Sequence, residues 1–315
     1  MFELRRLRLL HELELRGTLA AVAEALSYSP STISQQLAQL EREAGVALFV
    51  ADGRRVRLTE HGAALAAHAA RALELDEGIR GELEALRPGI APVRIAAMQT
   101  AAQAILPTAL RLLAERAPNI RVEVAQLPPE EGLFELSARK FDLVIAEQYP
   151  GHTRAHEAGL ERATLGEDLI RLALPRESRE TSLADLANRP WVMEPEGTAA
   201  RQWAVQQCRA TGFEPDVRFS LSDLTAHVRL IDSGLAVGLL PDLVWAGRTP
   251  TVRLVDLESA PTREIFTALR ESSISRPGIR TVLDALRDAF PVRAGKLHSV
   301  AASSPNNAQA PSTQE

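Results

Sequence analysis

The sequence predicts an α/β protein in which a small helical N-terminal unit is joined by a long helix to a larger unit of alternating strands and helices. Three observations lead to this fold class. The first 45 residues carry apolar side chains at helical spacing between short breaks, residues 60–86 lack proline and are rich in Ala, Leu and Glu, and short apolar runs then alternate with helical patterns. The 315 residues, 45% hydrophobic and 24% charged, suffice for about two ordinary domains with apolar cores.

The N-terminal unit is expected to begin with three helices. Leucines at steps of three form the apolar stripe of the first helix, and Gly17 ends it. Thr18 is a suitable N-cap for the second helix, which is rich in alanine. Ser29 can cap the third helix, Pro30 occupies its first turn, and Gly45 terminates it. The expected helices span residues 4–16, 19–26 and 30–44.

The third helix has two distinct faces, one apolar and one made of uncharged hydrogen-bonding side chains, about 120° apart at ~100° per residue. Glutamine can pair bidentately with the N6/N7 edge of adenine, and Ser or Thr can contact several base edges, so the polar face suits reading of a DNA major groove. A merely solvated face is the alternative. The apolar face holds Ile33, Leu37, Leu40 and Ala44, and the polar face holds Thr32, Gln35, Gln36 and Gln39.

A basic two-stranded ribbon is expected directly after these helices. Two β-prone runs, 46–50 and 54–59, flank an Asp-Gly turn. The tip and return strand carry Arg54, Arg55 and Arg57. A basic ribbon after a helix-turn-helix is a wing, which would lie along the phosphate backbone and position the helix. For the arginines alone, a hairpin kept in solution by its charge is the alternative.

Residues 60–87 are expected to form a linker and dimerisation helix. Apolar side chains recur there at steps of three, four or seven residues, and a helix that extends from a small domain needs a partner for such a stripe. We expect a second copy of the chain to supply it. The stripe consists of Leu65, Ala69, Ala72, Ile79, Leu83 and Leu86, and a linker follows at 87–92.

The remaining chain is expected to fold as βα units on a mainly parallel sheet, because short apolar runs alternate with helical patterns. Residues 294–315, rich in Ser, Ala, Asn, Gln and Pro, are expected to be disordered. The expected strands are 93–97, 120–125, 141–146, 168–175, 191–193, 217–221, 235–241 and 264–269, with helices over 101–116 and 278–290.

Charge and composition exclude several classes of protein. Residues 1–60 hold eight arginines and eight acidic residues and are therefore neutral, so the net charge of −5 lies in the rest of the chain. This charge argues against a protein that coats nucleic acid non-specifically. No apolar stretch reaches the ~18 residues of a membrane span and no signal peptide is recognised, so we expect a cytoplasmic protein without a membrane partner. The single cysteine, Cys208, excludes an internal disulfide, and we expect it to be a buried thiol.

No catalytic constellation is recognised. The chain has no G-x-S-x-G elbow, no P-loop lysine and no G-x-G-x-x-G. His152 and His156, with Glu157 beside them, have a spacing that could hold a metal, but solvated residues of a connecting segment are the simpler interpretation. We therefore expect no enzymatic activity, no metal and no cofactor.

The order of these parts resembles the LysR-type transcriptional regulators, over nearly the whole chain to about residue 293. The sequence departs from the family pattern at Pro30 and Ser31, where Gln-Pro is common, and at Ala51, where a basic residue is usual. The matching segments are 17–26, 29–45, the pair Leu48 and Phe49, 54–62, FDLVIA at 141–146 and SGLAVGLLP at 233–241.

The resemblance implies an N-terminal winged helix-turn-helix, a long linker helix and a two-lobed α/β effector domain resembling type 2 periplasmic binding proteins. The implied ranges are 1–59, 60–87 and 92–293, with lobe one combining 92–164 and 264–293 and lobe two spanning 165–263. The residues implied to bind DNA are Ser31, Thr32, Ser34, Gln35, Gln36, Gln39, Arg54, Arg55 and Arg57.

An effector is expected in the cleft between the lobes. Met98, Gln99 and Thr100 follow the first strand of this unit, where free amides at a helix start favour an anionic or carbonyl group. Three carboxylates opposite, Glu147, Glu194 and Glu196, would suit a ligand with an amino or guanidino group, such as a basic amino acid, unless they are ordinary surface acids. The turn at 194–198 and the pair Ser222 and Asp223 would form the other wall. The expected effector-binding residues are Gln99, Thr100, Glu147, Glu194, Thr198 and Ser222.

The function favoured is a ligand-responsive transcription factor that binds paired half-sites in a double-stranded DNA operator as a homodimer or tetramer, and contacts RNA polymerase if it is an activator. Two alternatives come from other classes: a module that only binds a small molecule, and an enzyme with a DNA-binding appendage. The winged N-terminal unit opposes the first alternative, and the lack of a nucleophile or metal set opposes the second.

Overall fold

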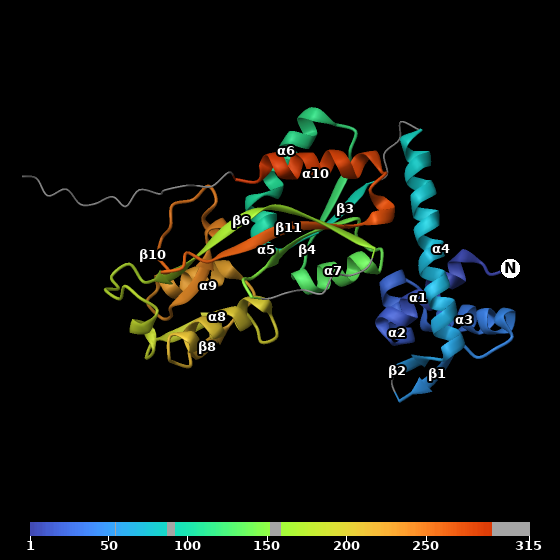
Figure 1. Ribbon diagram of the computed structural model, residues 1–315, viewed down its shortest axis with the longest axis horizontal. Helices are drawn as coiled ribbons and strands as arrows, with labels where there is room; N and C mark the ends of the chain where they lie inside the picture. The colour runs from blue at the N-terminus through green and yellow to red at the C-terminus, as the bar shows by residue number, and fades with distance from the viewer. Residues whose placement is uncertain (54, 87–91, 152–158, 292–315) are drawn as a thin grey trace, which may run out of the picture.

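The computed structural model describes residues 1–53, 55–86, 92–151 and 159–291 (Figure 1). Helices α1 to α3 pack with a two-stranded ribbon and with the first half of the long helix α4, and the three helices predicted before Gly45 are confirmed. Arg54, most of the predicted linker, the histidine pair and the C-terminal tail lie outside the described residues. The elements are α1 Leu4–Arg16, α2 Leu19–Leu26, α3 Pro30–Ala44, β1 Phe49–Asp52, β2 Arg55–Leu58 and α4 Glu60–Ala85.

Local signals explain why these elements begin and end where they do. The side-chain oxygens of Thr18 and Ser29 accept hydrogen bonds from amides in the first turns of α2 and α3, both at 3.1 Å. Gly17 ends α1 at a φ of 70°, in the left-handed region that favours glycine. Gly62 lies so close to the backbone of Leu48 that a Cβ atom would stand 1.8 Å from its carbonyl oxygen, so glycine is required where α4 passes the ribbon.

The α/β unit is built on a seven-stranded sheet in the order β10-β6-β11-β5-β3-β4, with β9 also paired to β6, and on a separate pair, β7 and β8. The strands are β3 Val93–Ala97, β4 Val122–Gln126, β5 Leu143–Gln148, β6 Leu160–Leu174, β7 Pro190–Met193, β8 Asp216–Ser220, β9 Gly238–Pro241, β10 Arg253–Asp256 and β11 Thr262–Arg270. The helices are α5 Gln99–Ala104, α6 Leu106–Arg116, α7 Pro129–Ser137, α8 Ala199–Ala210, α9 Leu224–Asp232 and α10 Pro277–Ala289, with 3₁₀ turns η1 Ala184–Leu186, η2 Asp242–Trp245 and η3 Glu271–Ser273.

The expectation of a mainly parallel sheet is wrong. Strands β4, β3 and β5 run parallel, but β11 is antiparallel to both β5 and β6, and β6 is antiparallel to β9 and β10. The long strands β6 and β11 lie side by side in the middle of the sheet (Figure 1). Strand β11 comes from a late part of the chain and pairs with β5 and β6. The alternation of strands and helices along the sequence therefore does not reveal whether it runs parallel or antiparallel to them.

Three further details of the α/β unit differ from the expectation. The helix expected over 101–116 is two helices, α5 and α6, which meet at Ile105. Pro107, in the first turn of α6, has no backbone N–H to donate to the preceding turn, so the helical hydrogen bonds are interrupted there. Helices α7 and α8 and strand β10 are additional elements. Strand β6 begins at Leu160, eight residues before the strand expected over 168–175.

Buried side chains form separate cores on the two sides of this unit, and we keep the names lobe one and lobe two for them. In lobe one, α5, α6 and α10 cover one face of β3, β5 and β11, and α7 covers the other face. In lobe two, α8 packs against β6 and β7 on one side, and α9 packs with β9 on another. The exact boundaries of the two lobes stay a prediction.

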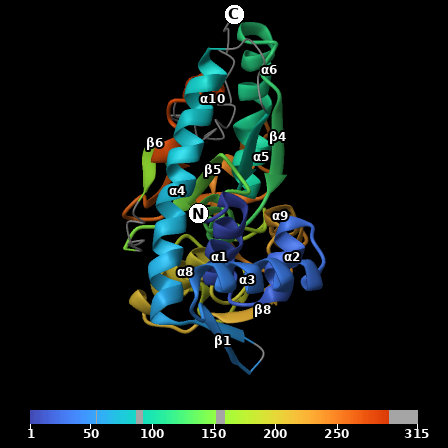
Figure 2. The same cartoon turned by 90° about the vertical axis from the view of Figure 1, so that its right-hand side faces the viewer.

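The N-terminal unit is docked on lobe one through ion pairs. Arg16 of α1 donates to Glu135 of α7 at 2.8 and 3.1 Å, and the side chains of both residues are nearly buried. Further along, Arg270 of β11 donates to Glu77 of α4 at 2.7 Å. Figure 2 shows α4 running along the molecule, with α3 and the ribbon together at its lower end, away from α10. Among the described helices, none combines the length and apolar character needed to span a bilayer.

Candidate functional site

Helix α3 presents a polar face to the outside while its opposite face is completely buried. Ile33, Leu37 and Leu40 have no exposed surface, because they pack into the core shared with α1, α2 and α4. This packing fixes the rotation of the helix, so that the side chains predicted to read DNA lie on the open side. Ser31, Ser34 and Gln35 are exposed, and Thr32, Gln36 and Gln39 are half-buried.

Two of these glutamines already have partners within the N-terminal unit. Gln36 accepts a hydrogen bond of 3.2 Å from Arg6 of α1, and Gln39 accepts hydrogen bonds of 2.6 and 3.0 Å from Arg42. These bonds hold the amides in place on the helix surface. A base edge would have to replace or share them, whereas Gln35 is exposed and available.

The ribbon β1–β2 stands beside α3 with its basic side chains outward. Arg55 and Arg57 are both exposed and, at alternate positions of β2, they point to the same side of the ribbon. A backbone hydrogen bond of 2.8 Å from Val56 to the carbonyl of Gly17 fastens the ribbon to the turn after α1. Arg54 has no described position. Figure 2 shows α3 and the ribbon together at one end of α4. The polar helix face and the two exposed guanidinium groups therefore belong to neighbouring elements.

The predicted ligand cleft is closed by a direct bridge between the lobes. The side chain of Gln99, in the first turn of α5, donates to Asp223 at 2.6 Å and accepts a hydrogen bond of 2.9 Å from the amide of Leu224, at the start of α9. One glutamine of lobe one is thus hydrogen-bonded to the N-cap side chain and to the first backbone amide of a helix of lobe two. The hollow beside it, lined by Tyr149 and Glu194 among others, measures only about 20 Å³.

A fully buried arginine organises the base of the cleft. Arg263, at the start of β11, donates to Asp168 of β6 at 2.8 and 2.9 Å, to Thr100 at 2.8 Å, and to Glu147. Burial opposes the charge on Arg263, but Glu147 and Asp168 raise the pKa of its guanidinium. Thr100 and Glu147, both predicted to bind the ligand, are therefore engaged by a protein side chain in this closed state, and their contact with an effector stays a prediction.

Glu194 is a carboxyl group in the cleft whose pKa is strongly raised. Burial, and then the negative charge of Glu147, raise the pKa of Glu194 to about 8, while Arg263 acts in the opposite direction. At neutral pH this side chain is therefore mostly protonated and can donate a hydrogen bond. A ligand cation placed beside it would favour the ionised form instead.

The other predicted effector residues lie farther out. Glu196 is exposed and 3.5 Å from Arg201, so the three expected carboxylates do not form one cluster. Thr198 caps α8, accepting a hydrogen bond from the amide of Arg201, and Ser222 is exposed. In the described part of the chain, no group of His, Cys, Asp and Glu side chains is arranged to hold a metal ion.

Sequence reasoning missed Arg263, Asp168 and Tyr149, which together surround the polar base of the cleft. A signal for Arg263 was present, since strand alternation places it on the same face as the buried Ile265. A charged residue in phase with a core position is unusual enough to mark a buried network. Asp168 carried the same signal, since it is in phase with the buried Ile170 of β6, although its partner lies 95 residues away.

Comparisons with known proteins agree with this arrangement. One matching family model is described as a bacterial regulatory helix-turn-helix protein of the lysR family, over residues 4–63, and another as a LysR substrate binding domain, over residues 89–291. The transcriptional dual regulator GltC of Bacillus subtilis is 30% identical over 250 residues, which cover 79% of this chain and 83% of the relative. A probable hydrogen peroxide-inducible genes activator of Mycobacterium avium is 30% identical over 270 residues, which cover 81% and 83%.

Solved structures share the fold. Full-length OxyR from Pseudomonas aeruginosa superposes with a TM-score of 0.66 at 20% identity, covering 92% of this chain and 96% of the other. Full-length CbnR complexed with its target DNA gives a TM-score of 0.53 at 24% identity, covering 91% and 100%. With a regulatory helix-turn-helix at one end and a substrate-binding domain over most of the remaining length, this chain belongs to the LysR family of ligand-responsive, DNA-binding transcriptional regulators.

Proposed function

We propose that copies of this protein bind paired half-sites in duplex DNA, with α3 in the major groove and the ribbon along the phosphate backbone. The observation that carries the proposal is the division of α3 into a buried apolar face and an open face with Ser34 and Gln35. Gln35 would contact base edges, and Arg55 and Arg57 would contact phosphates. In a two-fold symmetric assembly, half-sites would lie one helical turn, about 34–36 Å, or a multiple of it apart.

The surface proposed to join two copies is one face of α4. The expected stripe divides in two: Ala69 is buried in the core of its own N-terminal unit, with Leu65 and Ala72 packed against that core, whereas the later members are exposed. Leu75, which the stripe did not include, belongs to the exposed set. At ~100° per residue this set lies within an arc of about 80°. Its members and exposed fractions are Leu75 77%, Ile79 49%, Leu83 55% and Leu86 80%.

We propose that the effector enters where Gln99 now bridges the lobes. A ligand there would compete with Asp223 and the amide of Leu224 for that side chain, and it would need the lobes to part because the present hollow is too small. A ligand with an amino or guanidino group, such as a basic amino acid, stays the candidate, with Glu194 as the carboxylate that recognises the cation. Glu147 contributes less than expected, since Arg263 already neutralises it.

The mycobacterial relative is named for induction by hydrogen peroxide, an oxidant that would act on a reactive thiolate, and the cysteine of this chain does not support such a signal here. Cys208 is completely buried beside Trp203 and Trp191 in the core of lobe two. Burial, and then the charge of Glu214, raise the pKa of the thiol to about 12, so the reactive thiolate is scarce at neutral pH. We therefore favour a reversibly bound small molecule as the signal. We further propose that the protein is not an enzyme, acts in the cytoplasm, and contacts RNA polymerase if it is an activator.

DNA binding can be tested by fluorescence anisotropy with the duplex upstream of the protein's own coding sequence. Gln35→Ala should weaken binding by about 1–3 kcal/mol and relax base preference at one position of each half-site. Arg57→Gln should weaken binding to all sequences similarly and reduce the slope of log K against log salt by about 0.9 for each phosphate that the arginine no longer neutralises.

Matched controls are Gln206→Ala on the exposed side of α8 and Arg111→Gln on α6, both outside the N-terminal unit. Each should leave DNA affinity unchanged. If Gln35→Ala binds as tightly as Gln206→Ala, α3 does not read the DNA through this residue, and sequence-independent binding by the unaltered chain would remove the regulatory assignment of the site.

A further inference from the structure

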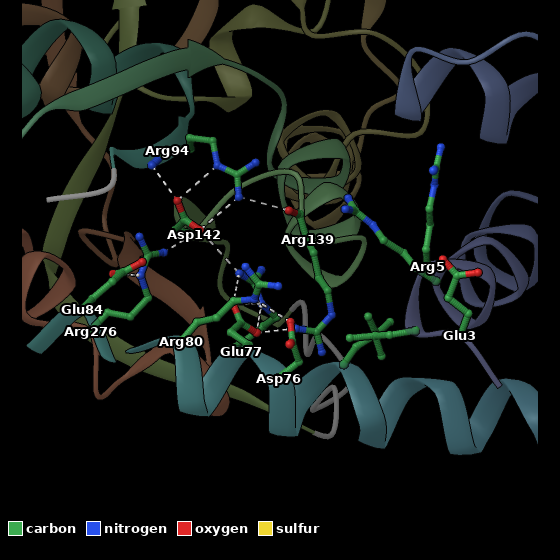
Figure 3. Close-up of a pocket in the computed structure, with 14 residues that line it drawn as sticks. Glu3, Arg5, Asp76, Glu77, Arg80, Glu84, Arg94, Arg139, Asp142 and Arg276 are labelled. Carbon is green, nitrogen blue, oxygen red and sulfur yellow. Dashed lines mark hydrogen bonds and ion pairs between the residues drawn. The ribbon is translucent and has the colours of Figure 1, made fainter. Parts of the chain in front are cut away.

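A second, larger cavity lies outside the cleft between the lobes, where α1, α4 and lobe one meet (Figure 3). Its volume is about 680 Å³, within the range of small-molecule sites and far above the hollow in the cleft. In Figure 3, Glu3 and Arg5 come from one side of this space and Arg94 and Asp142 from the other. Its walls hold Glu3, Leu4, Arg5, Arg8, Leu73, Asp76, Glu77, Arg80, Glu84, Arg94, Arg139, Asp142, Arg270 and Arg276.

The charge of this lining is unbalanced. Seven arginines face five carboxylates, which leaves two positive charges in excess, and only two side chains of the lining are apolar. Every one of the five carboxylates is already within ion-pair distance of a guanidinium group. The pairs are Glu3–Arg6 at 2.8 Å, Asp76–Arg80 at 2.6 Å, Glu77–Arg270 at 2.7 Å, Glu84–Arg276 at 2.9 Å and Asp142–Arg276 at 3.0 Å.

The excess charge is concentrated on α1. Within the described residues, Arg5 and Arg8 form no ion pair, and Arg5 lies over the ring of Tyr28, with its guanidinium carbon 5.1 Å from the ring centre. Both side chains are exposed, so no protein contact must be broken before Arg8 can bind a ligand. Arg8 is therefore free to contribute new hydrogen bonds, and the charge of Arg5 has no carboxylate partner within the described residues.

The opposite wall also carries a guanidinium group that is only partly satisfied. Arg139 pairs with Glu77, but its buried Nε atom has no hydrogen-bond partner among the described residues, and its backbone has a φ of 61°. Burial lowers the pKa of Arg139, the charge of Glu77 opposes this, and the charge of Arg270 adds to the lowering. The pKa of His11 on α1 is lowered by burial and by the charge of Arg139. Arg139 thus adds to this wall a guanidinium whose Nε atom has no acceptor among the described residues.

We propose that this cavity binds a small multivalent oxyanion, of the phosphate or polycarboxylate class, through Arg8 and Arg5 on α1 and Arg94 on lobe one. Arg94 donates from its Nε and Nη2 atoms to Asp142 and from Nη2 to the carbonyl of Arg139, and its Nη1 atom would donate to the ligand. Guanidinium groups present paired N–H donors that match carboxylate and phosphate oxygens, and a polar lining of this size suits a charged ligand better than an apolar one. Two or more negative charges would neutralise the excess. The class differs from the amine-bearing ligand proposed for the cleft.

An anion held here would contact three parts of the chain and would add to the core that joins α1 to α4 and to the ion pairs that join both helices to lobe one. It would contact side chains of α1 in the DNA-binding unit, of α4, and of β3 in lobe one. Because it binds only when these parts are together, it favours the docked arrangement. This consequence for DNA binding rests on the proposed function, whereas binding of the anion does not.

Titration calorimetry of the full chain in chloride buffer of constant ionic strength, without DNA, tests the site. Pyrophosphate and citrate serve as probes of the two anion classes. We expect saturable binding of at least one probe, and at least tenfold weaker binding for Arg8→Gln, since one charge-assisted contact is removed. Arg111→Gln on α6, which removes the same charge at an exposed position outside the cavity, should bind like the unaltered chain.

The outcomes separate clearly. Preference for pyrophosphate or for citrate identifies the class and supports the site in either case. Absence of saturable binding by both probes overturns the proposal, as does an equal loss in Arg8→Gln and Arg111→Gln, which would show non-specific charge attraction. If neither probe binds and Arg8→Gln weakens binding to duplex DNA, Arg8 serves DNA backbone contact and the cavity is not a ligand site.

Discussion

Replacing Glu77 by glutamine should remove most of the electrostatic attachment between α4 and lobe one. Burial by itself would raise the pKa of Glu77, but hydrogen bonds and charges from Arg270, with help from Ser272 and Arg139, lower it to about 2 from an ordinary 4.5. The side chain is 16% exposed, so solvent screens these interactions only weakly. At about 1.4 kcal/mol per pKa unit, the ionised carboxylate stabilises the folded state by about 3 kcal/mol.

The sign of the pH dependence follows from the lowered pKa. A carboxylate with a depressed pKa in the folded state contributes its full stabilisation above about pH 5 and loses it as the pH falls toward 2. Glu77→Gln cannot lose it, because glutamine does not titrate. We therefore expect the variant to be less stable than the unaltered chain by about 3 kcal/mol at pH 6, and the difference to shrink by about half at pH 3.

Urea unfolding followed by circular dichroism at several pH values measures this difference. Asp76→Asn is the matched control, because Asp76 is the neighbouring residue and pairs with the largely exposed Arg80. It should cost little at any pH. A stability gap between Glu77→Gln and the unaltered chain that stays constant from pH 6 to pH 3 would refute the assignment of the stabilisation to the ionised carboxylate.

Two further predictions concern the cleft and the assembly. Burial and the charge of Glu147 raise the pKa of Glu194 to about 8, so its ionisation destabilises the folded state increasingly as the pH rises from about 4.5 to 8. Glu194→Gln should therefore stabilise the fold at pH 8.5 by up to about 5 kcal/mol and leave it unchanged at pH 4.5. The gain is measured as a higher melting temperature. An equal shift at both values would contradict this. The double variant Ile79→Glu, Leu83→Glu should give a folded monomer by light scattering, whereas Leu110→Glu on α6 should not change the mass; persistence of the oligomer would place the interface elsewhere.

The N-terminal unit could be predicted almost completely because its signals are local. The caps at Thr18 and Ser29, the glycine after α1 and the leucine spacing all act within one or two turns of chain. The two faces of α3 follow from the helical period alone. For the same reason the polar face of α3 can be predicted from the sequence, whereas the hydrogen bond that Gln36 accepts from Arg6 cannot.

The α/β unit was predicted less well because its decisive contacts are between distant residues. The course of β11 through the sheet depends on pairing with β5 and β6, which precede it by about a hundred residues. The surroundings of Glu147 depend on Arg263, 116 residues further along. A pattern of charges along the chain shows which carboxylates exist, but not which of them a buried guanidinium has already neutralised.

The sequence by itself thus determined the winged helix-turn-helix, the long helix and the presence of a unit of strands and helices. Helical periodicity, capping residues, a basic ribbon and short apolar runs need no information from elsewhere in the chain. Only the tertiary structure decided which half of the α4 stripe remains exposed, that Gln99 closes the cleft, and that arginines from α1 and lobe one converge on one cavity. These depend on which surfaces meet when separate parts of the chain pack together, and burial then fixes which charges are compensated and which are left open.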